Sequence, residues 1–349
     1  MSSNLLQIKD LSIGYGTKVI ANQLSAVIPS GELICLLGSN GTGKSTLIRS
    51  ICAFQPILGG DVLVDHFNVH SLSERELSKQ ISVVLTDRVV VPNASVAELV
   101  GYGRSPYTGM LGRMNTEDKA IVANAIKECG IAHKKDSLLS SLSDGERQKA
   151  FIAKALAQDT PLIILDEPTA FLDLPARVEI MQLLRNIANT SGKSILMSTH
   201  DLDLALQLSD RLWLLQNGGT LQTGSPEDLL LGNAFQSMFQ HKGIVFDNKT
   251  GLFKVKHKQN TQVAVKGHGF EYVLLRRALA RKGISIVKAD AQDGNRIEVV
   301  NDIATPFSIF LDNELICSEN SIEAFVKQVL NMKKLLGEQS LVYQVTDKG

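Results

Sequence analysis

The feature that most constrains the fold is a glycine-rich segment that directly follows a continuous apolar run. Residues 33–37 are all apolar, which is typical of a strand buried on both faces of a sheet. A helix is expected from about Lys44, so the segment predicts the strand–loop–helix unit from which α/β sheets are built. The loop fits the pattern G-x-x-x-x-G-K-[ST] and comprises Gly38, Ser39, Asn40, Gly41, Thr42, Gly43, Lys44, Ser45 and Thr46.

This loop has the composition of a site for nucleotide phosphates. Its glycines allow consecutive backbone N–H groups to turn inward, and the positive end of the following helix faces the same point. Lys44 is expected to reach the β- and γ-phosphates, and the Ser45 hydroxyl to bind Mg²⁺. The alternative, an ordinary glycine turn, does not account for the strand before the loop and the helix after it.

A second apolar run, residues 162–165, ends in two acidic residues. A buried strand places Asp166 at the carboxyl edge of the sheet beside the phosphate loop, where its carboxylate can hold the Mg²⁺ shell. Glu167 is then placed to orient and polarise an attacking water. Acids often end strands without any catalytic role, so this interpretation depends on the phosphate loop in the same chain.

The segment LSDGERQ, residues 142–148, has two interpretations that do not conflict. Ser143 and Glu146 fit S-x-x-E, a capping box that begins a helix. A capped helix N-terminus with the Ser143 hydroxyl and the Gly145 backbone is also a good site for a γ-phosphate.

Composition and charge narrow the class of protein. Hydrophobic residues make up 44% of the 349, which is enough for a real core. Lys plus Arg and Asp plus Glu are both 36, so the whole chain has no electrostatic footprint for nucleic acid. No apolar stretch approaches the roughly 20 residues that cross a bilayer, and the first residues do not resemble a signal peptide. We therefore expect a cytoplasmic protein. The four cysteines fit no metal-ligand spacing and are expected to be structural thiols, which favours a reducing compartment.

Taken in order, these motifs resemble those of ATP-binding-cassette (ABC) ATPases over residues 5 to about 255. LSDGERQ resembles the signature motif of that family, and residues 170–173 resemble the loop that couples two ATP sites through its aspartate, Asp173. Tyr15 lies where the family stacks an aromatic ring on adenine. His200 matches the switch histidine that contacts the γ-phosphate.

The resemblance implies an α/β fold: a P-loop NTPase cassette with a RecA-like core, an antiparallel β subdomain and a helical subdomain at about 88–158. It also implies ATP hydrolysis, with Glu167 and His200 as the catalytic residues. In this family the signature of one subunit completes the ATP site of a second. Ser143, Gly145 and Asp173 are therefore expected to act in a homodimer.

Two positions depart from the family pattern. A glutamine that touches Mg²⁺ and senses the membrane partner normally follows the strand at 81–85, but here Thr86 and Asp87 follow it. Thr86 could reach the metal through water, and Asp87 could supply a carboxylate oxygen. The signature has Asp144 where glycine is usual, which adds negative charge near phosphate, so we expect hydrolysis to be tuned but retained.

Three short strings, at 103–107, 155–158 and 200–205, resemble the ATPases of iron-chelate, haem and vitamin B12 importers. Those ATPases work as homodimers under two membrane permease subunits that a substrate-binding protein supplies. The resemblance implies a peripheral position on the inner face of the cell membrane. Two other functions stay open: a soluble cassette ATPase that acts on nucleic-acid complexes, and a regulatory module that binds ATP without turnover.

The resemblance leaves the last ninety or so residues unassigned. A polar stretch, KHKQNTQ, favours a cassette domain at 1–257 and a separate α/β domain at 258–349. In the second domain we expect strands at 263–266, 284–288 and 296–300 and a hairpin around Asp312 and Asn313. Helices are expected at 270–281 and 321–335. A small-ligand site, a regulatory or dimer contact and a passive appendage all remain open as its role.

Overall fold

The computed structural model describes residues 4–85, 93–109, 112–235, 244–247, 252–255, 261–289, 295–300 and 306–336. The chain divides into two compact units, Met1–Gln240 and His241–Gly349, each of which is described by itself. The sequence placed the boundary later, between 257 and 258. The difference is the hairpin of β11 (Ile244–Asp247) and β12 (Leu252–Val255), which forms a two-stranded sheet of its own and adds no strand to the sheets of the first unit.

The centre of the first unit is a six-stranded sheet in the order β10-β9-β3-β8-β7-β6. Its strands from β9 to β6 are parallel, and β10 is an antiparallel edge. The central strands are continuous apolar runs because both faces of the sheet are covered. The strands are β3 (Leu33–Gly38), β6 (Ile81–Val84), β7 (Leu162–Leu165), β8 (Ser194–Ser198), β9 (Arg211–Leu215) and β10 (Leu221–Gly224).

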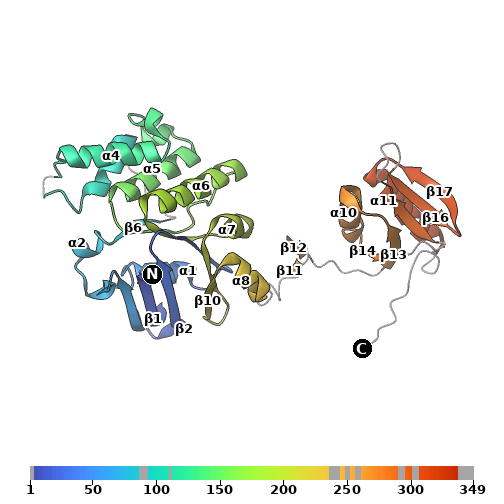
Figure 1. Cartoon of the computed structure of the whole chain (residues 1–349), viewed down its shortest axis with the longest axis horizontal. Coiled ribbons are helices and arrows are strands. Elements are labelled where there is room, and N and C mark those ends of the chain that lie inside the picture. Colours follow the sequence, from blue (N-terminus) through green and yellow to red (C-terminus); the bar gives the residue numbers. More distant parts are fainter. Residues whose placement is uncertain are drawn as a thin grey trace. The chain divides into compact units, whose positions relative to one another are not determined.

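Helices that follow these strands pack against the sheet (Figure 1). Helix α1 follows β3, α6 follows β7, and α7 follows β8. Because these strands are parallel, each βα connection begins at the same edge of the sheet, the carboxyl edge. The helices are α1 (Lys44–Ile51), α6 (Leu174–Ser191), α7 (Leu202–Leu208) and α8 (Pro226–Leu231). The carboxyl ends of the parallel strands therefore gather the loops in which a nucleotide site is expected.

A four-stranded antiparallel sheet, in the order β2-β1-β4-β5, shares one hydrophobic core with the central sheet. This is the expected antiparallel β subdomain. Its strands are β1 (Asn4–Tyr15), β2 (Lys18–Pro29), β4 (Gly59–Val64) and β5 (Phe67–Asn68), followed by the short helix α2 (Glu74–Leu77).

The helical part of the first unit lies within the expected limits of about 88–158. It contains α3 (Val96–Gly101), α4 (Thr116–Glu128) and α5 (Asp144–Ala157), which contact one another. A Cβ added to Gly103 would lie 2.3 Å from the carbonyl oxygen of Lys154, so only glycine allows this close approach to α5.

Two polar side chains stabilise the position of these helices: Arg104 joins α4 to α5, and Gln158 joins α5 to the central sheet. The buried Arg104 guanidinium donates from Nε to Asp118 Oδ1 (2.9 Å) and from a terminal nitrogen to the Ala157 carbonyl (3.0 Å). The hydrogen bond from Arg104, together with one from the Asn115 N–H, holds the pKa of Asp118 below its ordinary value. Gln158 Nε2 donates to the carbonyls of Ser78 (2.6 Å) and Ile81 (3.1 Å) and so ties the end of α5 to the start of β6.

All four cysteines are free, as expected. Cys35, Cys52 and Cys129 are buried, and burial raises the pKa of the Cys35 and Cys129 thiols to about 12. In the parts of the chain that the structure describes, no helix is long and apolar enough to cross a membrane.

The second unit has the elements that its sequence predicts. A five-stranded sheet in the order β14-β13-β15-β16-β17 packs against two helices around a core that includes Val265, Leu279 and Phe325. The elements are β13 (Thr261–Lys266), α10 (Gly269–Ala280), β14 (Ile284–Lys288), β15 (Arg296–Val299), β16 (Phe307–Leu311), β17 (Glu314–Glu319) and α11 (Ile322–Leu336). In the turn between β13 and α10, a Cβ on Gly267 would lie 2.7 Å from Val299 Cβ, so packing requires glycine there.

Candidate nucleotide site

The phosphate loop runs from the end of β3 to the start of α1. Gly43 precedes α1 with φ 102°, a conformation that favours glycine. A Cβ on Gly38 would lie 2.7 Å from both the Leu215 carbonyl oxygen and Thr42 Oγ1. The backbone of the loop therefore takes a path that side chains at these two positions would block.

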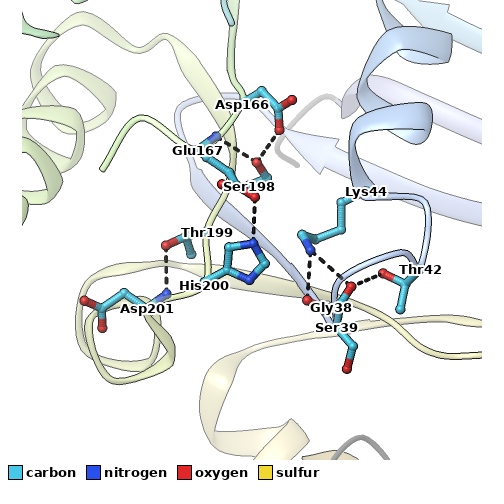
Figure 2. Close-up of polar contacts among 10 residues, drawn as sticks. All are labelled: Gly38, Ser39, Thr42, Lys44, Asp166, Glu167, Ser198, Thr199, His200 and Asp201. Atoms are coloured by element: carbon cyan, nitrogen blue, oxygen red, sulfur yellow. Dashed lines mark hydrogen bonds and ion pairs between the residues drawn. The ribbon is translucent and has the colours of Figure 1, made fainter. Parts of the chain in front are cut away.

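The Lys44 ammonium is held inside this loop. Its Nζ donates to the carbonyls of Gly38 (2.9 Å) and Ser39 (3.3 Å), and Thr42 Oγ1 donates to the same Ser39 carbonyl (2.9 Å) (Figure 2). Lys44 is buried, whereas Asn40, Gly41 and Ser45 are exposed. The loop thus encloses the positive charge of Lys44, and its exposed residues are accessible to a ligand.

Tyr15 lies beside the loop, where an adenine-stacking ring is expected. Its hydroxyl is 3.3 Å from Thr46 Oγ1, which places the end of β1 next to the first turn of α1. The Tyr15 side chain is exposed, so a face of the ring is available to a planar group.

Asp166 and Glu167 follow β7, at the carboxyl edge of the sheet. Both bond to Ser198 at the end of β8, the neighbouring strand: Ser198 Oγ donates to Asp166 Oδ1 (2.6 Å) and accepts from the Glu167 N–H (2.9 Å). Glu167 has φ 51°, in the left-handed region. The sequence did not single out Ser198. Its only signal was a hydroxyl at the end of an apolar strand, two residues before His200.

His200 meets Glu167 in the same place. Its Nε2 is 2.6 Å from Glu167 Oε1, and both side chains are partly exposed (Figure 2). Two residues that lie far apart in the sequence therefore form one acid–base pair. A carboxylate held by an imidazole and open to solvent can accept a proton from a bound water.

Ser143 forms the capping box at the start of α5. Its hydroxyl accepts from the Glu146 N–H (3.2 Å), and the Glu146 carboxylate accepts from the Ser143 N–H (2.9 Å). Asp144, the departure in the signature, forms an ion pair in which its Oδ1 lies 3.5 Å from Arg147 Nη1. Gly145 is in the first turn, where a Cβ would lie 3.5 Å from Ala176 Cβ, an ordinary contact.

Asp173 caps the next long helix. Its Oδ1 accepts from the Ala176 N–H at 3.0 Å, and so begins α6. Phe171 and Leu174, on either side of it, are 76% and 63% exposed. Thr86 and Asp87 lie outside the described residues, so their predicted approach to a metal stays a prediction.

Comparison with known proteins identifies the cassette. The family model described as ABC transporter matches residues 21–170. An uncharacterized ABC transporter ATP-binding protein from Methanocaldococcus jannaschii is 34% identical over 253 residues, covering 72% of this chain and 87% of that protein. The iron(3+)-hydroxamate import ATP-binding protein of Bacillus subtilis is 36% identical over 248 residues (71% and 92%). The ferric enterobactin transport ATP-binding protein of Escherichia coli is 30% identical over 243 residues (70% and 90%).

Solved structures have the same fold. A cassette from Clostridium perfringens that is part of an ABC transporter complex matches with a TM-score of 0.59 and 27% identity, covering 68% of this chain and 96% of that one. A dimeric ATP-binding cassette in a post-hydrolysis state, bound to ADP and Pi, matches with a TM-score of 0.55 and 25% identity (63% and 98%). The resemblance inferred from the motifs and the α/β cassette fold are thereby confirmed. The chain belongs to the ATP-binding proteins of ABC transporters, a family of ATPases whose ATP hydrolysis is coupled to transport.

Proposed function

We propose that this chain is the ATP-hydrolysing subunit of an importer for an iron-siderophore, haem or cobalamin-type cargo. The main support for ATP hydrolysis is the 2.6 Å contact between His200 Nε2 and Glu167 Oε1. This contact lies at the carboxyl edge of the central sheet, the edge from which the phosphate loop also extends. The cargo class is supported by relatives whose names state import of iron(3+)-hydroxamate, petrobactin and ferric enterobactin.

In the proposed reaction, Glu167 orients the attacking water and takes its proton, and His200 holds the carboxylate and contacts the γ-phosphate. Lys44 exchanges its carbonyl contacts in the loop for β- and γ-phosphate oxygens, since an ammonium gains more from an anion than from a neutral carbonyl. The N–H groups of the loop add to this cradle. Tyr15 stacks on the adenine.

The residues beside the loop fit Mg²⁺. The proposed protein donors are the Ser45 hydroxyl and the Asp166 carboxylate, both of them hard oxygen ligands. Mg²⁺ usually takes one or two carboxylates together with substrate phosphates, which is the donor set offered here. When bound, the ion would neutralise charge on the β- and γ-phosphates. Thr86 or Asp87 would contribute a further oxygen.

A homodimer completes the proposed site. Ser143 and Gly145 at the N-terminus of α5 would bind the γ-phosphate of the opposite subunit, since a helix N-terminus attracts anions. The exposed residues around Asp173 would form part of the contact between subunits. The dimeric cassette among the similar structures supports this assembly.

The remaining proposed partners are two membrane permease subunits and, indirectly, a substrate-binding protein. They would hold the chain on the inner face of the cell membrane. The reported relatives are transport proteins and do not support the nucleic-acid alternative. The Glu167–His200 pair favours turnover over ATP binding alone.

The test is Glu167→Gln, which keeps the size of the side chain but removes the proton acceptor. It should bind ATP normally, lose nearly all turnover and accumulate as an ATP-bound dimer, measured by phosphate release, nucleotide binding and size-exclusion chromatography. Glu227→Gln, an exposed acid in the first turn of α8, is the control and should retain the wild-type rate. Wild-type hydrolysis by Glu167→Gln would contradict the catalytic assignment.

The cargo is tested separately in cells. A strain that lacks this chain should recover uptake of one labelled cargo, ferric siderophore, haem or cobalamin, when the wild type is supplied, and should not recover it with Glu167→Gln. Unchanged uptake of all three cargoes in the deletion strain would refute the importer assignment without affecting the ATPase assignment.

A further inference from the structure

One buried hydroxyl, that of Ser198, bonds to both acidic residues of the site. It lies at the end of β8, beside β7, and its side chain is fully buried. The hydroxyl donates its proton to Asp166 Oδ1 (2.6 Å) and accepts the backbone N–H of Glu167 (2.9 Å) (Figure 2). A hydroxyl is both a donor and an acceptor, and here each capacity serves a different residue.

The backbone of Glu167 needs such support. Its φ of 51° lies in the left-handed region, which is unfavourable for a residue with a Cβ and persists only where the surroundings hold it. Two described hydrogen bonds fix this peptide segment. One runs from the Glu167 N–H to Ser198, and the other from the Ala170 N–H to the Glu167 carbonyl (3.0 Å).

The same backbone conformation presents the Glu167 carboxylate to His200, two residues beyond Ser198. We propose that Ser198 is a positioning residue that holds the Glu167 backbone in the left-handed conformation that aims its carboxylate at the reacting water. This inference rests on the proposed role of Glu167 as the catalytic carboxylate. Ser198 itself touches neither nucleotide nor water in this role.

An alanine at this position cannot replace the hydroxyl. Because the Ser198 side chain is fully buried, its removal would leave the Glu167 N–H without this acceptor, and Asp166 would lose this donor. The Glu167 peptide would then relax toward an ordinary φ and carry the carboxylate away from its position. A misplacement of about 1 Å costs roughly a hundredfold in rate, so Ser198→Ala should act on kcat.

The chain provides a matched control in the same strand. Ser194, at the other end of β8, is also fully buried, and its hydroxyl likewise joins two groups, which here are both backbone groups. It accepts from the Gly31 N–H (3.0 Å) and donates to the Pro29 carbonyl (2.9 Å). Ser194→Ala therefore removes a comparable hydroxyl without changing the site. Thermal stability should fall similarly in both alanine variants.

The experiment compares Ser198→Ala with Ser194→Ala in the full chain, measuring kcat, the KM for ATP, the affinity for a fluorescent non-hydrolysable ATP analogue, and Tm. Ser198→Ala should lower kcat about ten- to a hundredfold, with KM and analogue affinity within about twofold of the wild type. Ser194→Ala should leave kcat within about twofold. Equal kcat values in the two variants would overturn the proposal.

A second pair keeps the test decisive if Ser198→Ala is unstable. The variants Ser198→Thr and Ser198→Val introduce side chains of the same shape, and both side chains suit a strand, but only threonine retains the hydroxyl. Threonine should hydrolyse ATP at least about tenfold faster than valine at equal analogue affinity, and equal rates would refute the role of the hydroxyl. If Glu167→Gln retains the wild-type rate, the proposed function fails. If Glu167→Gln is inactive but Ser198→Ala is normal, only the positioning role fails.

Discussion

The ion pair between Arg104 and Asp118 gives the most sharply defined stability prediction. Both side chains are only 7% exposed, so Arg104→Ala would leave a carboxylate in a buried place without its main partner. Breaking a buried pair in this way costs about 3–5 kcal/mol. Asp118 still accepts the Asn115 N–H (3.1 Å), which favours the lower end, near 3. The lost bond to the Ala157 carbonyl adds about 1 kcal/mol.

We therefore expect Arg104→Ala to lower the free energy of unfolding of the first unit by about 4 kcal/mol. Trp213, the single tryptophan, is buried in the core of this unit, so its fluorescence in urea reports the transition. The control is Arg211→Ala. Arg211 pairs with Glu32, but their side chains are 40% and 27% exposed, so the loss should stay below about 1 kcal/mol. Equal losses in the two variants would contradict the reasoning.

The pH dependence gives an independent check. Arg104 lowers the pKa of Asp118 in the folded state, so the pair stabilises the fold above the unfolded pKa of Asp, about 3.9. This contribution is lost as the pH falls below that value and through the lower folded pKa. The gap between wild type and Arg104→Ala should thus be largest near neutral pH and narrow below about pH 4. A gap that does not change with pH would show that packing, and not charge, stabilises this site.

Two further predictions concern coupling and domain independence. Asp87→Ala should lower partner-stimulated ATPase activity more than basal activity in a reconstituted transporter, because Thr86 and Asp87 replace the glutamine that normally senses the membrane partner. Equal activity with and without the substitution would exclude a role of Asp87 in coupling. A chain that ends near Lys256 should stay soluble and hydrolyse ATP, because the second unit has its own core. Loss of ATP binding in that folded, shortened chain would show that the second unit belongs to the catalytic fold.

Local patterns in the sequence predicted most of the secondary structure that the sequence analysis describes. The run before Gly38 predicted a buried strand, and short local segments after residue 258 predicted the strands and helices of the second unit, because these signals involve neighbours in the chain. Strand order could not be read in this way. Strand β3 pairs with β8 and β9, more than a hundred residues away, and no local pattern encodes that pairing.

The candidate site divides in the same manner. Lys44, Asp166 and Glu167 belong to contiguous motifs and were predicted from them, whereas Ser198 and Arg104 act through partners distant in the sequence. A serine at the end of a strand or an arginine before Ser105 has many ordinary roles. Only the three-dimensional contacts show that one of them bonds to both acids and that the other holds two helices together.

The two helix starts that we propose to lie at the dimer contact also stabilise the fold of the single subunit. Ser143 begins α5, and Asp173 begins α6, each by accepting a backbone N–H. Losing such a cap costs about 1 kcal/mol, but each capped start also gathers N–H groups that attract an anion. An activity lost on replacing Ser143 with alanine therefore does not by itself establish contact with nucleotide. Threonine preserves both the cap and the hydroxyl, whereas asparagine preserves the cap alone, so the difference between these two replacements isolates the hydroxyl.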